Sequence, residues 1–130
     1  MSSVAPTKWA EDFASATNQD AELNVHGKFF TCTYLLDMGT RKVIVEMHRG
    51  KVENVNLDPQ PLDAYQFALR APEETWRGMA KEVPEPMYHG IWAASFRKGL
   101  RMEGDLLVLM QNLRCFTRQI ELLRQTGVPV

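Results

Sequence analysis

The alternation of side chains along residues 28–70 predicts a run of short strands. In the segment Arg41–His48, for example, Val43, Val45 and Met47 fall on one side and Lys42, Glu46 and His48 on the other. A period of two is typical of a strand with one buried face. The predicted strands are Lys28–Leu36, Arg41–His48, Lys51–Asp58 and Ala64–Arg70. Because turn residues separate them at short intervals, we expect an antiparallel meander with one face covered.

Apolar residues at helical spacing predict helices before and after the strands. Trp9, Phe13 and Ala16 define a first amphipathic helix, and Pro72 with two acidic residues begins a helix that Pro84 interrupts. Proline and acidic residues are both favourable in a first helical turn. The other predicted helices span Pro86–Lys98 and Leu106–Arg124, and the first spans Pro6–Thr17. The beginning of the last helix is apolar on nearly every side, so this helix is expected either to be covered on both sides or to adjoin a cavity or a partner.

The stretch Ser95–Asp105 joins the last two predicted helices and is the most specific pattern in the chain. Gly99 is the expected end of one helix, and Leu100 and Met102 then lie on one side of a short strand. Gly104-Asp105 supplies a flexible backbone and a carboxylate that can cap the next helix.

This pattern, with the order of elements around it, resembles the sterol carrier protein type 2 family over roughly residues 22–125. The residues that carry the resemblance are Phe96, Gly99, Leu100, Met102, Gly104, Asp105 and Leu113. The resemblance implies an α+β domain in which helices cover an antiparallel sheet of about five strands, with an apolar tunnel between them that takes acyl chains, sterols or related lipids. It implies that the ligand-binding residues are Phe67, Trp76, Met79, Trp92, Phe96, Met102, Leu106, Leu109, Met110 and Leu113.

Size and charge limit the classes of function. At 130 residues the chain is expected to form one domain, residues 1–130, and its net charge of −1 lacks the basic surplus of a nucleic-acid-binding protein. No run approaches the roughly 18 apolar residues of a membrane span. The first residues show neither the basic start nor the apolar stretch of a signal peptide, so a cytoplasmic protein is expected.

The sequence offers little catalytic chemistry. His26, His48 and His89 do not have metal-ligand spacing, and no glycine-rich phosphate loop is present. Cys32 and Cys115 are expected to be reduced, buried thiols. We therefore predict no metal, no cofactor and no catalytic residue.

The sequence thus favours a carrier or accessory protein that binds a lipid, a sterol-like compound or another apolar small molecule. Two alternatives stay open. The chain could be a non-enzymatic interaction subunit, as a homodimer or as the partner of an enzyme, with a vestigial cavity. It could also be a small enzyme that acts on an apolar substrate through His48 or His89.

Overall fold

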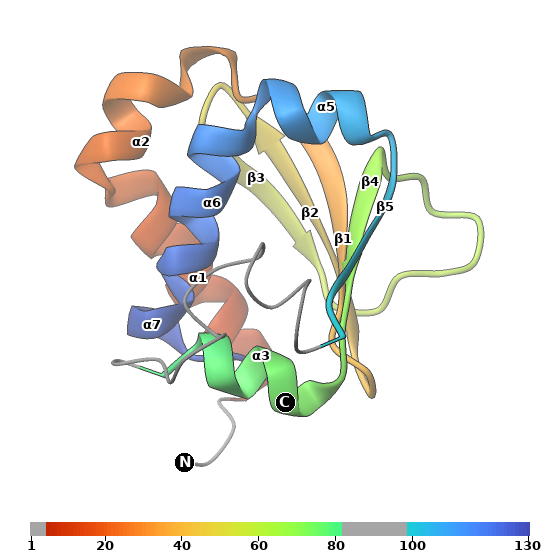
Figure 1. The fold of residues 1–130 in the computed structure, drawn as a ribbon. Coiled ribbons are helices and arrows are strands. Elements are labelled where there is room, and N and C mark those ends of the chain that lie inside the picture. Colours follow the sequence, from red (N-terminus) through yellow and green to blue (C-terminus); the bar gives the residue numbers. More distant parts are fainter. Residues whose placement is uncertain (1–4, 82–98) are drawn as a thin grey trace.

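A computed structural model describes residues 5–81 and 99–130 and contains one five-stranded sheet. The strands are β1 (Cys32–Asp37), β2 (Lys42–His48), β3 (Lys51–Asn56), β4 (Phe67–Arg70) and β5 (Arg101–Gly104). The described helices are α1 (Pro6–Gln19), α2 (Ala21–His26), η1 (Gly27–Phe29, a 3-10 turn), α3 (Glu73–Met79), α5 (Leu106–Gln111), α6 (Leu113–Glu121) and α7 (Leu123–Thr126). They gather on one side of the sheet, and the β3–β4 connection lies away from them (Figure 1). The expected α+β architecture is confirmed.

The order of the strands, β3-β2-β1-β4-β5, differs from a meander at one place. β1 pairs with β2 in the antiparallel sense, but it pairs with β4 in parallel, with Leu36 opposite Leu69. The chain therefore crosses the sheet after β3 instead of turning back beside it, and the sheet is mixed. The prediction of a simple meander was wrong here because alternation with a period of two is the same for both strand directions.

Several strands and helices begin or end at other residues than the sequence predicted. The strand expected from Lys28 starts at Cys32, since Gly27–Phe29 forms the 3-10 turn η1, and the strand expected from Ala64 starts at Phe67. The helix expected over Leu106–Arg124 is divided at Asn112 and Leu122 into α5, α6 and α7. The predicted helix Pro86–Lys98 lies outside the described residues.

The helix α2 was not predicted, and a single carboxylate explains its position. Asp20 ends α1, and its side chain accepts a hydrogen bond from the Leu23 backbone N–H at 3.0 Å, so it is the N-cap of α2. The same carboxylate accepts from the Arg118 guanidinium of α6 at 2.7 Å. One residue thus starts a helix and ties it to the C-terminal part of the chain.

The main core lies between the sheet and the helices. Tyr34, Phe67 and Phe116 form a compact aromatic group, with ring centroids 4.9 to 5.5 Å apart. Trp76 of α3 donates from Nε1 to the carbonyl of Asp37 at the end of β1, at 2.9 Å. Trp9 of α1 donates to the carbonyl of Gly127 at 2.7 Å, so the first and last described helices are joined.

Candidate functional site

The helix-covered face of the sheet is the candidate site, and strand alternation decides which residues reach it. Tyr34 and Leu36 of β1, Val45 of β2, and Phe67 and Leu69 of β4 point into this layer, and each is fully buried. Alternate residues of the same strands point to the opposite face. The result is an apolar layer built from inward-facing side chains of neighbouring strands.

The structure brings most of the residues expected to bind a ligand into this layer. Phe67, Trp76 and Leu109 are fully buried, Met79 is 2% exposed, and all four belong to one apolar cluster. Met102 and Leu113 are half-buried and pack against that cluster. Trp92 and Phe96 lie outside the residues that the structure describes. That these residues line an open tunnel stays a prediction.

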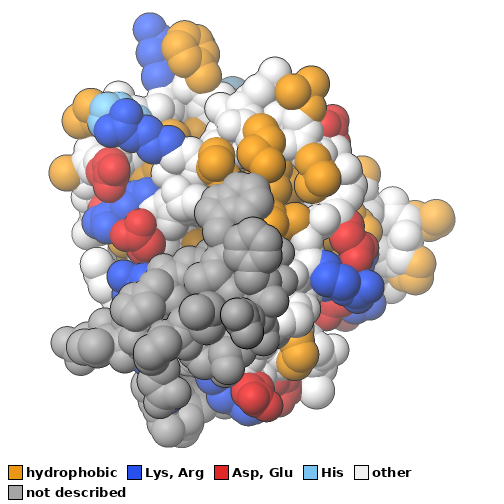
Figure 2. Space-filling view, in the orientation of Figure 1, with side chains coloured by type: hydrophobic (Ala, Val, Ile, Leu, Met, Phe, Trp, Pro, Cys, Tyr) orange, Lys and Arg blue, Asp and Glu red, His pale blue; other side chains and the backbone are white. Residues whose placement is uncertain are grey.

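Leu106 and Met110 were also expected in the wall, but they are 43% and 48% exposed. The reason is the composition of α5, which is apolar on every side, so that only the side carrying Leu109 turns to the core. Leu107, on the same short helix, is 67% exposed. Leu106, Leu107 and Met110 form the α5 surface patch. Figure 2 shows hydrophobic side chains gathered at the α5 end of the molecule.

The turn between β5 and α5 fixes where this patch lies. Gly104 has φ +94°, and a Cβ there would come within 2.8 Å of the Gln66 carbonyl oxygen, so only glycine fits without a shift. The next residue, Asp105, donates its backbone N–H to that carbonyl at 2.7 Å. Its carboxylate accepts from the Val108 N–H at 3.2 Å, which confirms the predicted cap.

A buried polar group crosses the core and was not predicted. The Tyr34 hydroxyl donates to Gln119 Oε1 at 2.6 Å, and Gln119 Nε2 donates to Thr17 Oγ1 at 3.3 Å. Burial raises the pKa of Tyr34 well above its usual value, and nearby Cys32 adds to this shift. The hydroxyl therefore stays protonated at neutral pH and holds strand β1 to α6. Tyr34 lies in the inward row of its predicted strand, but nothing in the sequence pairs it with Gln119.

The cysteines are free, as expected, and unsuited to nucleophilic chemistry. Burial raises the pKa of the Cys32 thiol to about 12, with a smaller contribution from Cys115. Burial also raises the pKa of Cys115, whose Sγ donates to the His26 carbonyl at 3.4 Å. A thiol is a good nucleophile only as the thiolate, which neither residue forms readily.

Two broader features of residues 5–81 and 99–130 bear on chemistry. Their His, Cys, Asp and Glu side chains form no group of three or more that could hold a metal ion. None of their helices combines the length and the apolar character needed to cross a membrane. The helix-covered layer combines buried apolar side chains with the hydrogen-bonded Tyr34, Gln119 and Thr17 side chains.

Comparison of the fold with solved structures decides the architecture. A crystal structure of sterol carrier protein 2 matches with a TM-score of 0.71 at 14% sequence identity, over 90% of this chain and 94% of that chain. The fold is SCP2-like. A second match within this fold is a UbiJ-SCP2 ubiquinone synthesis protein, with a TM-score of 0.59 and 11% identity over 92% of this chain and 91% of that one. Neither a protein-family model nor a curated protein matches the sequence. The resemblance seen in the sequence is thus confirmed as an SCP2-like fold.

Proposed function

We propose that this protein binds a lipid or another apolar small molecule between its sheet and its helices, as a carrier or accessory protein. The observation that carries the proposal is the apolar layer around Phe67, Trp76 and Leu109, which lies under the helices of an SCP2-like fold. Binding there is driven by removal of apolar ligand surface from water, at about 25 cal/mol per Å².

The helix α5 is the proposed route into the layer. Leu109 reaches the core, while Leu106 and Met110 on neighbouring turns of the helix face solvent, so α5 joins the interior to the surface. The helix has six residues, and its capping carboxylate is exposed. Short, weakly packed elements open at low free-energy cost, as access to a buried site requires.

We further propose that the protein acts by binding and not by catalysis, and that it works in the cytoplasm. The Tyr34 hydroxyl and the Gln119 amide are bonded to each other, and the Cys32 thiol is held protonated. Among residues 5–81 and 99–130, no base is hydrogen-bonded to the Cys32 thiol or the Tyr34 hydroxyl, as an activated nucleophile requires. Two free, buried thiols agree with a reducing compartment.

The test combines mass spectrometry of the purified protein with a matched pair of variants. Native mass spectrometry is expected to detect a co-purified apolar molecule, and long-chain fatty acid is expected to change tryptophan emission saturably. Leu109→Trp fills the layer and is expected to abolish uptake, at an overpacking cost of about 1–3 kcal/mol. Leu107→Trp, on the exposed side of the same helix, is the control and is expected to bind as wild type does.

Three results would overturn the lipid proposal. The first is wild-type protein that takes up neither acyl nor sterol probes at micromolar concentration. The second is a Leu109→Trp variant that keeps its circular dichroism spectrum and still binds. The third is equal loss of binding in both variants, which would place the effect on α5 itself and not on the buried layer.

The α5 surface patch favours one alternative, an interaction subunit. Leu106, Leu107 and Met110 are exposed together, and one structure with the same fold is a ubiquinone synthesis protein, so an accessory role beside an enzyme is the second candidate. Under this alternative, Leu107→Lys is expected to abolish self-association or partner binding, measured by light scattering after gel filtration. Under the lipid proposal, Leu107→Lys leaves the mass in solution unchanged.

A further inference from the structure

The face of the sheet opposite the helices carries two ordered rows of side chains. Strand register aligns Lys42, Asp37 and Arg70 across β2, β1 and β4, which makes a charged row. Two residues along each strand, Ile44, Leu35 and Ala68 align in the same way and are 4%, 4% and 1% exposed. This apolar row is a second small cluster, separate from the main core.

The β3–β4 connection, residues 57–66, covers the apolar row and is fastened at both ends. Toward β3, the Asp63 carboxylate accepts from the Gln60 backbone N–H at 2.8 Å and from Asn56 Nδ2 at 3.0 Å. At its end, Gln66 exchanges hydrogen bonds with the Thr33 backbone, accepting from its N–H at 2.9 Å and donating to its carbonyl at 2.8 Å. The connection is thus a fixed cover over the sheet.

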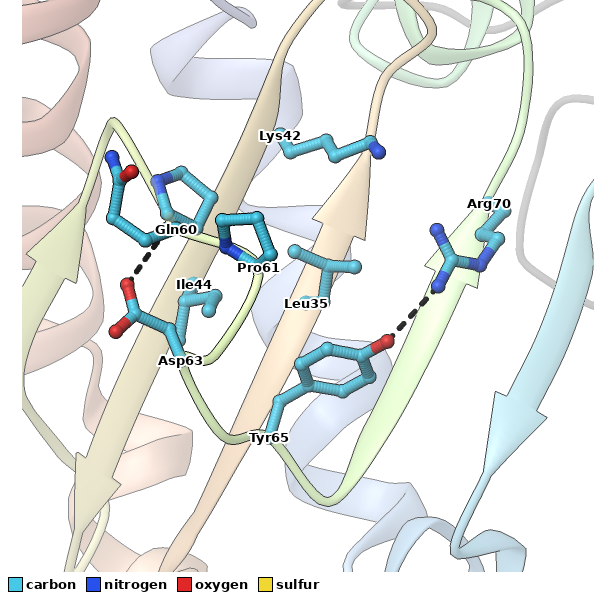
Figure 3. A pocket seen from close by; sticks show the side chains of 9 residues that line it. Leu35, Lys42, Ile44, Gln60, Pro61, Asp63, Tyr65 and Arg70 are labelled. Atoms are coloured by element: carbon cyan, nitrogen blue, oxygen red, sulfur yellow. Dashed lines mark hydrogen bonds between the residues drawn. The ribbon is translucent and has the colours of Figure 1, made fainter.

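A cavity of about 280 Å³ remains between this cover and the sheet. Leu35 and Ile44 form its floor, Pro61 and the Tyr65 ring form walls, and Figure 3 shows the Lys42 side chain extending toward the Arg70 side of it. The remaining lining residues are Pro59, Gln60, Asp63 and Arg70. The volume suits a small molecule and is below the usual range of about 300–1,000 Å³ for ligand pockets.

Among the described residues, two charged side chains that line the cavity, Lys42 and Asp63, have no salt-bridge partner. The Arg70 guanidinium is balanced by Asp37 and by Glu103, each at 2.9 Å, and also donates to the Tyr65 hydroxyl at 3.0 Å. Asp63 is occupied by the two N–H donors that fasten the connection. The Lys42 side chain forms no ion pair or hydrogen bond with any residue in the described part of the chain. Its ammonium is the cation at this cavity that no carboxylate of the described residues pairs with.

We propose that this cavity binds a small monocarboxylate with a short apolar or aromatic body. The carboxylate lies against the Lys42 ammonium, and the body rests on Leu35 and Ile44 beside the Tyr65 ring. The Lys42 ammonium attracts one carboxylate, the Asp63 carboxylate of the same cavity disfavours a second negative charge, and the apolar floor rejects small hydrophilic anions by leaving them poorly solvated. The site is independent of the proposed lipid function, because it lies on the other face of the sheet.

The test is a titration of ¹⁵N-labelled protein with benzoate, followed by amide chemical shifts. We expect saturable shifts that map to Leu35, Ile44 and Tyr65. Benzyl alcohol, a neutral probe of similar size, is expected to bind several-fold more weakly. Lys42→Met removes the charge and is expected to weaken benzoate binding several-fold. Lys8→Met, which removes an exposed lysine of α1 that pairs with Asp12, is the control and is expected to have no effect.

Three outcomes of this titration would contradict the proposed carboxylate site. The proposal is wrong if benzoate gives no saturable shifts, if the shifts map to the helix-covered face, or if Lys42→Met binds benzoate as wild type does. Uptake of long-chain fatty acid by Lys42→Met is expected to stay at the wild-type level. A failed benzoate titration beside normal fatty-acid uptake would therefore reject this site alone, and the reverse result would reject the lipid proposal alone.

Discussion

At the scale of single residues, two aspartates begin helices in different surroundings. Asp20 is 8% exposed at its side chain, and its carboxylate is bonded to both the α2 backbone and Arg118. Asp105 is exposed, and among the described residues its carboxylate is bonded to the start of α5 alone. Substitutions at the two positions can therefore distinguish the contribution of a helix cap to the free energy of unfolding from the contribution of an ion pair.

Asp20→Asn keeps a capping residue but removes the charge that faces Arg118. The hydrogen bond from Arg118 lowers the pKa of Asp20 in the folded state, against the opposing effect of burial. This stabilisation is therefore fully present above the unfolded-state pKa of about 3.9 and is lost as pH falls through the lower folded-state value. Urea unfolding is expected to show the Asp20→Asn variant less stable than wild type at pH 7, with the gap closing in acid. A gap that does not change with pH would contradict this.

Asp105→Ala tests the cap alone. The free energy of unfolding is expected to fall by about 0.5–2 kcal/mol, the usual loss when a cap is removed. Asp105→Asn, which can accept the same hydrogen bond from Val108, is expected to retain most of the stability. An unchanged unfolding midpoint in Asp105→Ala would show that this carboxylate has another role.

The two thiols give a prediction that needs no substitution. Because burial raises the pKa of Cys32 to about 12, its thiolate is scarce at pH 8, and the pKa of Cys115 is shifted in the same direction. Alkylation by iodoacetamide at that pH is expected to be much slower in folded protein than in urea. Mass spectrometry of the labelled peptides checks each cysteine separately, and rapid labelling of folded protein would contradict the prediction.

At the scale of elements, the sequence predicted the positions of the strands in the chain, but not their order and direction in the sheet. The alternation of Val43, Val45 and Met47 identified β2 because one face of that strand is buried throughout. The same signal could not give the direction of β4, which depends on the course of the connection from Asn56 to Phe67 and on what that connection covers.

The predicted boundaries of the C-terminal helix were wrong for a related reason. The segment from Leu106 onward continues its apolar spacing through Asn112 and Leu122, with neither glycine nor proline to mark the breaks. The six-residue helix α2 is too short for a periodic pattern, and nothing in the sequence distinguishes Asp20 as the cap of a new helix from a residue that ends the preceding one. Packing against other elements decides such boundaries.

Two glycines with positive φ, Gly99 before β5 and Gly104 in the β5–α5 turn, can be compared. At Gly99, φ is +73° and, among the described residues, the atom nearest to an added Cβ is Pro72 Cδ at 3.8 Å, so Gly99→Ala is expected to cost about 1–2 kcal/mol for backbone conformation. Gly104→Ala adds the 2.8 Å approach to the Gln66 carbonyl and is expected to cost more. Denaturant unfolding of both variants measures the difference, and equal losses would show that the turn can relax.

At the scale of the whole molecule, each of the two proposed binding sites is built from residues that lie far apart in the sequence. The family resemblance led to Phe67, Trp76 and Leu109, because the signature around Gly104-Asp105 places the following helix over the sheet. It could not lead to Lys42 and Tyr65, since no local pattern brings β2 and the β3–β4 connection together. For the same reason, no pattern in the sequence indicated that the polar side chains of β1, α6 and α1 meet in the core.

The polar trio of Tyr34, Gln119 and Thr17 joins the sheet to α6 and α1, and its energetics can be measured by a double-mutant cycle. Gln119→Leu leaves the Tyr34 hydroxyl buried without its partner and is expected to cost about 1–3 kcal/mol. The pair Tyr34→Phe with Gln119→Leu removes both groups and is expected to be more stable than Gln119→Leu alone. Unfolding free energies of the four proteins give the coupling, and additive losses would mean that the two side chains act independently.

The parallel pairing of β1 with β4 has a consequence for the newly made chain. β1, β2 and β3 are consecutive and can pair through short turns, but the other edge of β1 stays open until β4 and β5 follow. That edge belongs to a strand whose residues Tyr34, Leu35 and Leu36 are all apolar in character and buried in the finished fold. An open apolar edge is a template for pairing with another molecule. We therefore expect refolding yield to fall with protein concentration, and aggregation to begin at β1 whenever synthesis or refolding pauses before β4.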